Sequence, residues 1–162
     1  MSTYAVVDSP VGPLTLVAED DALVGLYMVD QRHRPVIAGA RDDRVLPGLR
    51  EQLAAYWERE LKDFDVPVRL SGTPFQQQVW AGLRTIPYGE TWSYGELAAA
   101  LGRPGASRAV GLANGRNPVG IVVPCHRVVG SSGSLTGYGG GLERKRWLLD
   151  LEAGLPSQAV RL

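Results

Sequence analysis

The chain has 162 residues, 44% of them hydrophobic, and its net charge is zero because 17 basic residues balance 17 acidic ones. This length fits one domain or two small ones, and no stretch approaches the roughly 18 apolar residues that a membrane span needs. The N-terminus shows no basic segment followed by an apolar one, and a lone cysteine suits a reducing compartment, so we expect a cytoplasmic protein.

The charges are segregated along the chain. Residues 1–70 carry 8 Lys or Arg and 12 Asp or Glu, whereas residues 71–162 carry 9 and 5. Between positions 103 and 146 there are seven basic residues and one acid. Such a run is ordinarily a solvated face. In a neutral protein it also indicates a polyanionic partner, and arginine suits bidentate contacts with phosphate.

The first part of the chain has the pattern of a small antiparallel sheet. Apolar residues alternate in short runs that turn-forming residues separate. Asp20-Asp21 predicts a tight hairpin turn, and residues 31–45 show no periodicity and predict a loop. The predicted strands are 3–8, 13–19 and 22–29.

A helix is predicted from Pro47 to Leu61, because large apolar residues recur there at helical spacing. The alternating segment 64–70 is either an edge strand or a linker. The breaker cluster at 71–74 is the predicted domain boundary. The predicted units are an N-terminal domain at 1–72, a second domain at 73–155 and a C-terminal tail at 156–162.

The second half is mostly helical by pattern. Thr73 can cap a helix that has Pro74 at its first position. Ser93 followed by Glu96 three residues later has the spacing of a capping box. The helices predicted here are 74–86, 93–101, 107–115 and 143–151.

Two of these helices, 93–101 and 107–115, are joined by a tight glycine turn and form a helix-turn-helix candidate. The second helix is unusual as a major-groove reader, because Arg108 is its one long polar side chain. Its small residues suit close approach to a narrow groove, where one arginine can occupy the place of a flipped-out base. The ordinary alternative is that small residues let two helices pack tightly, with Arg108 at the surface.

The single cysteine, Cys125, precedes His126 and follows the apolar segment 121–124, which is expected to be extended and buried. A lone thiol has no internal disulfide partner and completes no thiolate-rich metal cluster. A neighbouring base and positive charge favour the nucleophilic thiolate, although a small buried core residue is the alternative. The glycine- and serine-rich segment 130–141, with Tyr138 between glycines, predicts a flexible linker or a lid over a pocket.

Six motifs of the second half stand in an order typical of one family. They are Phe75-Gln76-Gln77-Gln78-Val79-Trp80, Ile86-Pro87-Tyr88-Gly89-Glu90-Thr91, Ser93-Tyr94-Gly95-Glu96-Leu97, Arg108-Ala109-Val110-Gly111, Pro124-Cys125-His126-Arg127-Val128 and Gly137-Tyr138-Gly139-Gly140-Gly141-Leu142. The chain resembles the O6-alkylguanine-DNA alkyltransferases of the bacterial Ogt type, also called methylated-DNA–protein-cysteine methyltransferases. The resemblance covers about residues 1–155 and is strongest over 73–152.

The resemblance implies a set of catalytic residues. Cys125 would accept the alkyl group from O6 of guanine, once and irreversibly. His126 would be its base, acting through a water, and Glu152 would orient that histidine, although a glutamate near a helix end is by default solvated. Asn117 would complete the set and tie it to the recognition helix, and Tyr94 would meet the charge of the departing guanine.

The resemblance also implies how DNA is held. The damaged base would be flipped out through the minor groove, read by backbone groups near Val128 and Gly139, and enclosed on one side by Tyr138. The residues expected to contact DNA are Arg108, which would fill the gap in the duplex, and Ser107, Ala109, Gly111, Arg116 and Tyr94.

The implied fold is α+β. A small RNase H-like antiparallel sheet with one helix would be followed by a mainly helical, winged helix-turn-helix-like domain. The expected partner is double-stranded DNA containing O6-alkylguanine, with no cofactor and no membrane. Some relatives bind zinc in the N-terminal domain, but with one cysteine and two histidines we predict no metal here. A monomer is expected; the preferred alkyl size, activity on O4-methylthymine and cooperative clustering on DNA stay open.

Three other functions are weighed against this one. A sensor that binds alkylated bases without chemistry is an alternative, but such relatives replace the reactive cysteine, which is present here as Cys125. A transcription regulator would need a further domain. A cysteine hydrolase would need turnover, and no separate oxyanion motif is evident in the sequence.

Overall fold

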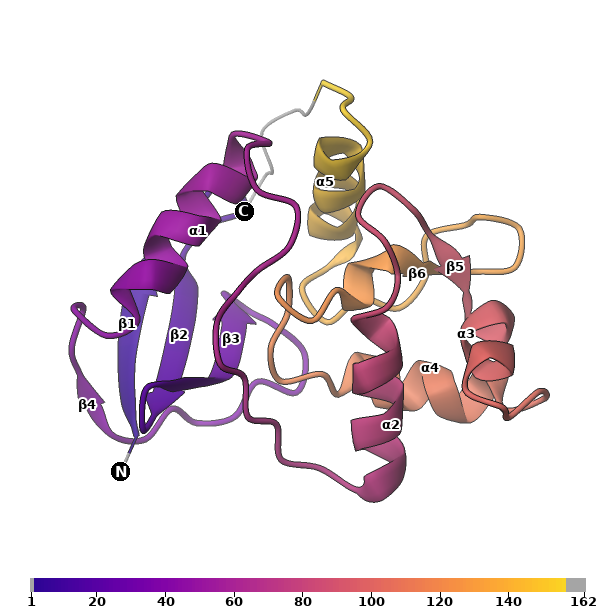
Figure 1. The fold of residues 1–162 in the computed structure, drawn as a ribbon, viewed down its shortest axis with the longest axis horizontal. Helices are drawn as coiled ribbons and strands as arrows, with labels where there is room; N and C mark the ends of the chain where they lie inside the picture. The colour runs from indigo at the N-terminus through magenta and orange to yellow at the C-terminus, as the bar shows by residue number, and fades with distance from the viewer. Residues whose placement is uncertain (1, 157–162) are drawn as a thin grey trace.

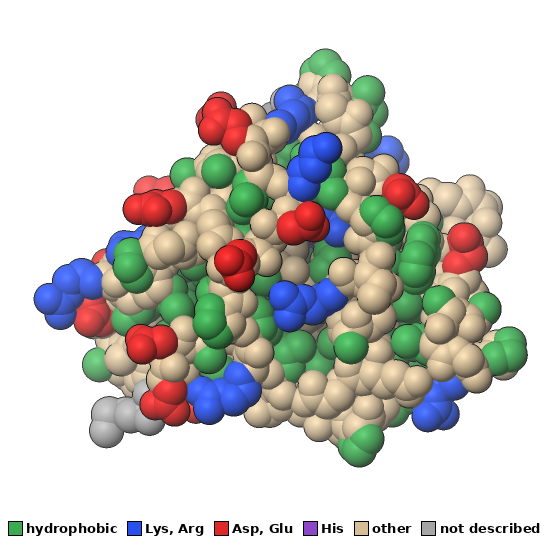
Figure 2. All heavy atoms as spheres, viewed as in Figure 1, with side chains coloured by type: hydrophobic (Ala, Val, Ile, Leu, Met, Phe, Trp, Pro, Cys, Tyr) green, Lys and Arg blue, Asp and Glu red, His purple; other side chains and the backbone are tan. Residues whose placement is uncertain are grey.

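The computed structural model describes residues 2–156, so the predicted tail at 156–162 lies outside the described residues except for its first position. A sheet and one helix form one side of the molecule, and the remaining helices form the other (Figure 1). On the face shown in Figure 2, most acidic side chains lie over the sheet side, as the charge segregation predicts. No helix among the described residues is long and apolar enough to cross a membrane.

The sheet has four strands in the order β3-β2-β1-β4, antiparallel except for the β1–β4 pair. The three predicted strands are confirmed, and so is the turn between the last two. Asp20 and Asp21 have φ values of 49° and 63°, the left-handed values that a two-residue type I′ turn requires. A fourth, two-residue strand lies within the predicted loop. The strands are β1 (Thr3–Val7), β2 (Leu14–Glu19), β3 (Ala22–Met28) and β4 (Ala40–Arg41).

Helix α1 (Pro47–Trp57) lies across the sheet (Figure 1) and buries Leu49, Leu53 and Tyr56. It ends before the predicted Leu61, because Arg59 has a φ of 61°, which interrupts helical geometry. The segment 64–70 forms one bridge to the edge of β3 rather than a named strand.

The second half contains the predicted helices, and both predicted N-caps are confirmed. Thr73 and Ser93 each accept a side-chain hydrogen bond from the backbone N–H three residues on. The side chains of Gln76 and Glu96 accept in turn from the backbone N–H of Thr73 and Ser93, which completes two capping boxes. A two-residue parallel pair, β5 with β6, joins the helix-turn-helix to the segment after Cys125. The elements are α2 (Pro74–Leu83), β5 (Trp92–Ser93), α3 (Tyr94–Ala100), α4 (Ser107–Gly115), the 3-10 turn η1 (Cys125–Arg127), β6 (Val128–Val129) and α5 (Leu142–Glu152).

The segment 121–124 is not extended, and that prediction is wrong. Val122 and Val123 donate backbone hydrogen bonds to Gly120 and Val119, at 2.7 and 3.1 Å, which coils the chain into successive turns. Ile121 has a φ of 70°, an uncommon and costly conformation for a β-branched residue. An apolar run of this length has no periodicity that distinguishes a buried strand from a buried turn.

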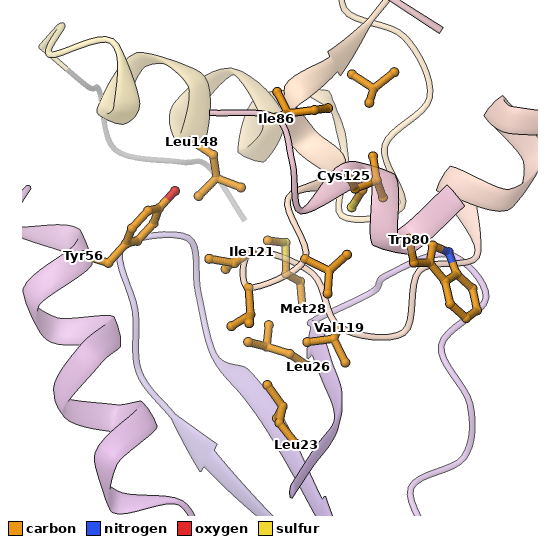
Figure 3. Packing of buried hydrophobic residues seen from close by; sticks show 14 of the residues in the cluster. Leu23, Leu26, Met28, Tyr56, Trp80, Ile86, Val119, Ile121, Cys125 and Leu148 are labelled. Atoms are coloured by element: carbon orange, nitrogen blue, oxygen red, sulfur yellow. The ribbon is translucent and has the colours of Figure 1, made fainter. Parts of the chain in front are cut away.

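The core holds this turn in place from the sheet side. Leu26 of β3 donates its N–H to Pro118 at 2.9 Å and accepts one from Gly120 at 3.3 Å. Val119 and Ile121 pack with Leu26 and neighbouring β3 residues, and Cys125 lies at the edge of the same cluster (Figure 3). The sheet therefore positions the segment that leads to the cysteine.

Candidate active site

Cys125 begins η1 and is 7% exposed. Burial raises the pKa of its thiol, and a hydrogen bond from Asn117 and the charge of Lys145 oppose that rise only in part. The flanking Arg127 points to Glu152 instead of the thiol. The positive charge near the sulfur therefore comes from Lys145, and a thiol with a raised pKa needs a base to become nucleophilic.

His126 is fully buried beside the thiol residue, and its Nε2 lies 2.8 Å from Oε2 of Glu152. An ionised carboxylate only accepts, so Nε2 carries a proton, and in the neutral ring Nδ1 then carries the lone pair. Nδ1 is buried and has no hydrogen-bond partner among the described residues. The ring therefore presents one free basic nitrogen inside the protein.

Glu152, near the end of α5, is buried rather than solvated, with 1% of its side chain exposed. Arg127 donates from Nε to Oε1 at 2.8 Å and from Nη2 to Oε2 at 2.9 Å, and Tyr56 Oη donates to Oε2 at 2.6 Å. Burial raises the pKa of this carboxyl, but the charges and hydrogen bonds of His126 and Arg127 outweigh burial and hold its pKa well below the usual range. Glu152 is thus a buried carboxylate.

Asn117 braces the turn that carries the cysteine. Its Nδ2 donates to the carbonyls of Val119 and Val123 at 3.3 and 2.8 Å, and its Oδ1 accepts from the N–H of Val119 at 3.0 Å. These bonds hold the left-handed conformation at Ile121 in place. The link to the recognition helix comes from Asn114 of α4, whose Nδ2 donates to the Cys125 carbonyl at 3.4 Å.

A cleft of about 580 Å³ opens in front of this centre. It is bounded by α4, by the start of α2, by the loop around Tyr138 and by the loop that follows β3. A second cavity of about 10 Å³ lies directly against Cys125, which is room for about one water molecule. The two cavities share Gly115, Gly137, Tyr138 and Gly139, so the glycine-rich loop stands between cleft and thiol. The cleft is lined by Arg32, His33, Thr73, Phe75, Gln76, Tyr94, Ala109, Gly111, Leu112, Ala113, Gly115, Arg116, Gly137, Tyr138 and Gly139.

Only some of the residues expected to hold the flipped guanine line the same cavity. Tyr138 and Gly139 line both cavities. Tyr94 lines the cleft but not the small cavity, and its hydroxyl donates to the Thr136 carbonyl at 3.2 Å. Val128 is fully buried in β6 and lines neither cavity.

The outer face of α4 carries the residues expected to contact DNA. Arg108, Ala109 and Arg116 are exposed, and Ser107 and Gly111 are half-buried. Leu112 is 72% exposed on the same face and was not singled out from the sequence. This face combines small residues, two cations and one apolar side chain.

The basic stretch at 103–146 is not one surface, which corrects the expectation from its sequence. Arg127, Arg144 and Lys145 are buried. Arg144 donates to the carbonyls of Val11, Val29 and Gly140. The buried three bind carbonyls and a carboxylate of the protein itself and are not available to a polyanion.

Several site residues were missed by sequence reasoning. Lys145 Nζ donates to the Thr136 carbonyl at 2.7 Å, and burial lowers its pKa to about 8. Asn114 lies with Val110 and Ala113 on the buried face of α4. A polar residue at a position where helical spacing predicts the core is a signal that could have identified it. Tyr56 had no such signal, since tyrosine is common in apolar helix faces. Residues 2–156 contain no cluster of three or more His, Cys, Asp or Glu side chains that could hold a metal ion.

A recognition helix set in front of a single buried cysteine, with a histidine–glutamate pair behind it, defines a helix-turn-helix protein built around one thiol. The family model for the DNA-binding domain of 6-O-methylguanine DNA methyltransferase matches residues 74–154, and that for its ribonuclease-like domain matches residues 2–70. The chain belongs to the 6-O-methylguanine DNA methyltransferase family. The expected α+β fold, a small sheet followed by a mainly helical half, is confirmed.

Curated relatives and a solved structure are similar over nearly the whole chain. The methylated-DNA–protein-cysteine methyltransferase of Mycolicibacterium paratuberculosis is 58% identical over 153 residues, which are 94% of this chain and 93% of that protein. That of Salmonella typhimurium is 45% identical, over 91% of this chain and 93% of that protein. The crystal structure of Mycobacterium tuberculosis OGT in complex with DNA superposes with a TM-score of 0.91 at 55% identity, covering 94% and 93% of the two chains.

Proposed function

We propose that this protein repairs DNA by direct reversal, moving the alkyl group of an O6-alkylguanine in duplex DNA onto Cys125. The observation that carries the proposal is the buried His126–Glu152 pair, joined at 2.8 Å, beside the one cysteine of the chain. Such a pair provides a base for a thiol whose pKa is raised by burial. The names of the relatives, and the DNA in the solved structure of one of them, support the same function.

The chemistry balances without a cofactor. The thiol proton passes to Nδ1 of His126, through a bridging water, while Glu152 stabilises the imidazolium that results. The Sγ–carbon bond forms as the bond between that carbon and O6 breaks, and the electron pair stays on the guanine. Tyr94 supplies the hydrogen bond that meets this charge, and the proton taken from the thiol is returned, by way of solvent, to N1 of the guanine. The product is a thioether and intact guanine, so each molecule acts once.

The cleft in front of the thiol is the proposed site for the flipped base. Arg108 would fill the gap left in the duplex, while Ser107, Ala109, Gly111 and Arg116 face the minor groove. The cavity beside Cys125, about 10 Å³, is far too small for a guanine. The loop around Tyr138, with backbone groups near Gly139 and Val128, would therefore shift to admit and read the base.

We infer two domains, at residues 1–72 and 73–155, which the two matched family regions support. We infer a monomer without a metal that works in the cytoplasm, where a single free thiol stays reduced.

The test is intact-mass analysis after incubation with a duplex containing one O6-methylguanine. Wild-type protein should gain one methyl group, on Cys125, and stop at one equivalent. Cys125→Ser should gain none while still binding the duplex. Repeated turnover would indicate a hydrolase, and tight binding without mass change would indicate a sensor; either result contradicts the proposal.

A further inference from the structure

Tyr56 contributes a polar atom from the sheet side of the molecule to the buried centre. It lies on α1, is fully buried, and donates its hydroxyl to Oε2 of Glu152 at 2.6 Å across 96 positions of sequence. Figure 3 shows its ring reaching from α1 toward Leu148 of α5, the helix that carries Glu152.

Packing alone does not account for this hydroxyl. The ring contacts Trp57, Phe64 and Tyr88, with centroid separations of 5.1, 5.2 and 6.3 Å, and a phenylalanine ring would fill the same space. Burial, and then the nearby charge of Glu152, raise the pKa of Tyr56 well above its usual value. The group therefore remains a protonated donor throughout the range in which proteins work.

Oε2 of Glu152 accepts from three groups at once: Tyr56 Oη, Arg127 Nη2 and His126 Nε2. We infer that Tyr56 is a positioning residue for alkyl transfer, because its hydroxyl fixes and partly neutralises the carboxylate oxygen that holds the His126 ring. The inference rests on the proposed function. It makes the docking of α1 against α5 part of the chemistry, since the N-terminal half supplies one of the donors that set the strength of the base.

The physical consequence concerns proton affinity. A hydrogen bond to a carboxylate disperses its negative charge, so Oε2 attracts the imidazolium less strongly while Tyr56 is present. Without the hydroxyl, the carboxylate would hold a protonated His126 more firmly, and a protonated imidazole cannot take the thiol proton. Activity should then be lost at a higher pH than in wild type.

Other groups near Glu152 set the background for this effect and remain in place in the variant. Each faces the carboxylate or lies close enough to influence its surroundings. They are Arg59 just after α1, Tyr88 after α2, His126 and Arg127 of η1, and Tyr138 of the glycine-rich loop.

The test compares Tyr56→Phe with Tyr88→Phe, a matched loss of one hydroxyl from the adjacent ring, which makes no hydrogen bond to Glu152 in the described structure. Single-turnover methyl transfer is measured from pH 5 to 9 alongside thermal unfolding. For Tyr56→Phe the acidic limb should move up by about 0.5–1 pH unit, a loss of roughly 3- to 10-fold on that limb. Tyr88→Phe should follow wild type.

As a second measurement, the ¹⁵N chemical shifts of the His126 ring report its proton directly. In Tyr56→Phe the ring should be fully protonated at a higher pH than in wild type. An unchanged pH profile, or an equal fall in rate at every pH, would overturn the inference. Wild-type protein that accepts no methyl group would instead refute the proposed function, so the two failures are distinguishable.

Discussion

The buried centre at Glu152 and the exposed face of α4 use their charged groups in opposite ways. At Glu152, four donor groups from Tyr56, His126 and Arg127 converge on one carboxylate. The side chains of Arg108 on α4 and of Arg116 at its C-cap are exposed and have no hydrogen-bond or ion-pair partner within residues 2–156. The groups proposed to act on the thiol are ordered by folding, and the groups proposed to meet DNA keep their donors free.

This difference predicts which mutations should lower stability as well as transfer and which should lower transfer from DNA alone. Changes in the buried centre should lower both the free energy of unfolding and the rate of transfer. Changes on α4 should affect only reactions with DNA, leaving stability and reaction with a free alkylated base nearly intact. The variants below run from the largest expected effect to the smallest.

Glu152→Gln should have the largest effect on both quantities. It leaves Arg127 buried without a counter-charge, which typically costs about 3–5 kcal/mol. It also replaces the carboxylate that holds the His126 ring with a neutral amide. Transfer should therefore fall by about 10- to 100-fold, the range typical for losing the carboxylate partner of a functional histidine. Urea unfolding and single-turnover kinetics measure the two. A variant as stable as wild type would contradict the prediction that the buried centre contributes to the free energy of unfolding.

The same residue predicts the pH dependence of stability. The pKa of Glu152 is lower in the folded protein than its ordinary value of 4.5, so the carboxylate stabilises the fold above that value. Its contribution falls progressively as the pH drops below about 4.5 toward the lower folded-state pKa. Relative to wild type, Glu152→Gln should therefore show a shallower loss of stability between pH 5 and pH 2, measured by thermal unfolding.

Lys145→Met should have the next largest effect on transfer. Its charge lowers the pKa of Cys125 and its Nζ holds the Thr136 carbonyl of the loop, so the rate at pH 7 should fall by roughly tenfold, the scale of one lost hydrogen bond to a charged group. Lys145→Arg, which keeps the charge, is the control. Equal loss in both variants would show that shape rather than charge matters.

The stability of wild type relative to this variant should depend on alkaline pH. Burial lowers the pKa of Lys145 from 10.5 to about 8, so the charged form is disfavoured in the fold and its cost is complete below pH 8. That cost disappears as the pH rises from 8 to 10.5. Wild type should gain stability relative to Lys145→Met over this interval; a constant difference would contradict the burial of a charged lysine.

Arg108→Ala tests the exposed face of α4. Transfer from methylated duplex should fall by about tenfold, in line with the loss of one desolvated charged contact, because nothing would hold the gap in the duplex open. Stability should change by less than about 0.5 kcal/mol, and reaction with a free alkylated guanine should be unchanged. A larger effect on binding undamaged DNA than on transfer would argue against a role in base extrusion.

Arg116→Ala should have the smallest effect. If Arg116 contacts one phosphate, the slope of log affinity against log salt should fall by about one, and affinity should weaken only a few-fold at physiological salt. The measurement is a salt titration of binding to undamaged duplex. Glu90→Ala, on a different surface loop, is a control that should leave the slope unchanged.

The sequence by itself determined the features that depend on near neighbours. The hairpin at Asp20-Asp21 and the capping boxes at Thr73 and Ser93 follow from the conformational preferences of a few adjacent residues. The order of six short motifs was enough to identify the family, and it named Cys125 and His126.

Only the tertiary structure decided which polar groups meet. Tyr56 and Glu152 are 96 positions apart, and Lys145 and Thr136 meet because α5 packs behind the glycine-rich loop. Burial also reversed local expectations, since it raises the pKa of Cys125 and turns Arg127 inward. Residue types report local propensity, whereas the free energy of a buried charge depends on its surroundings in space, and those are set by packing between distant segments.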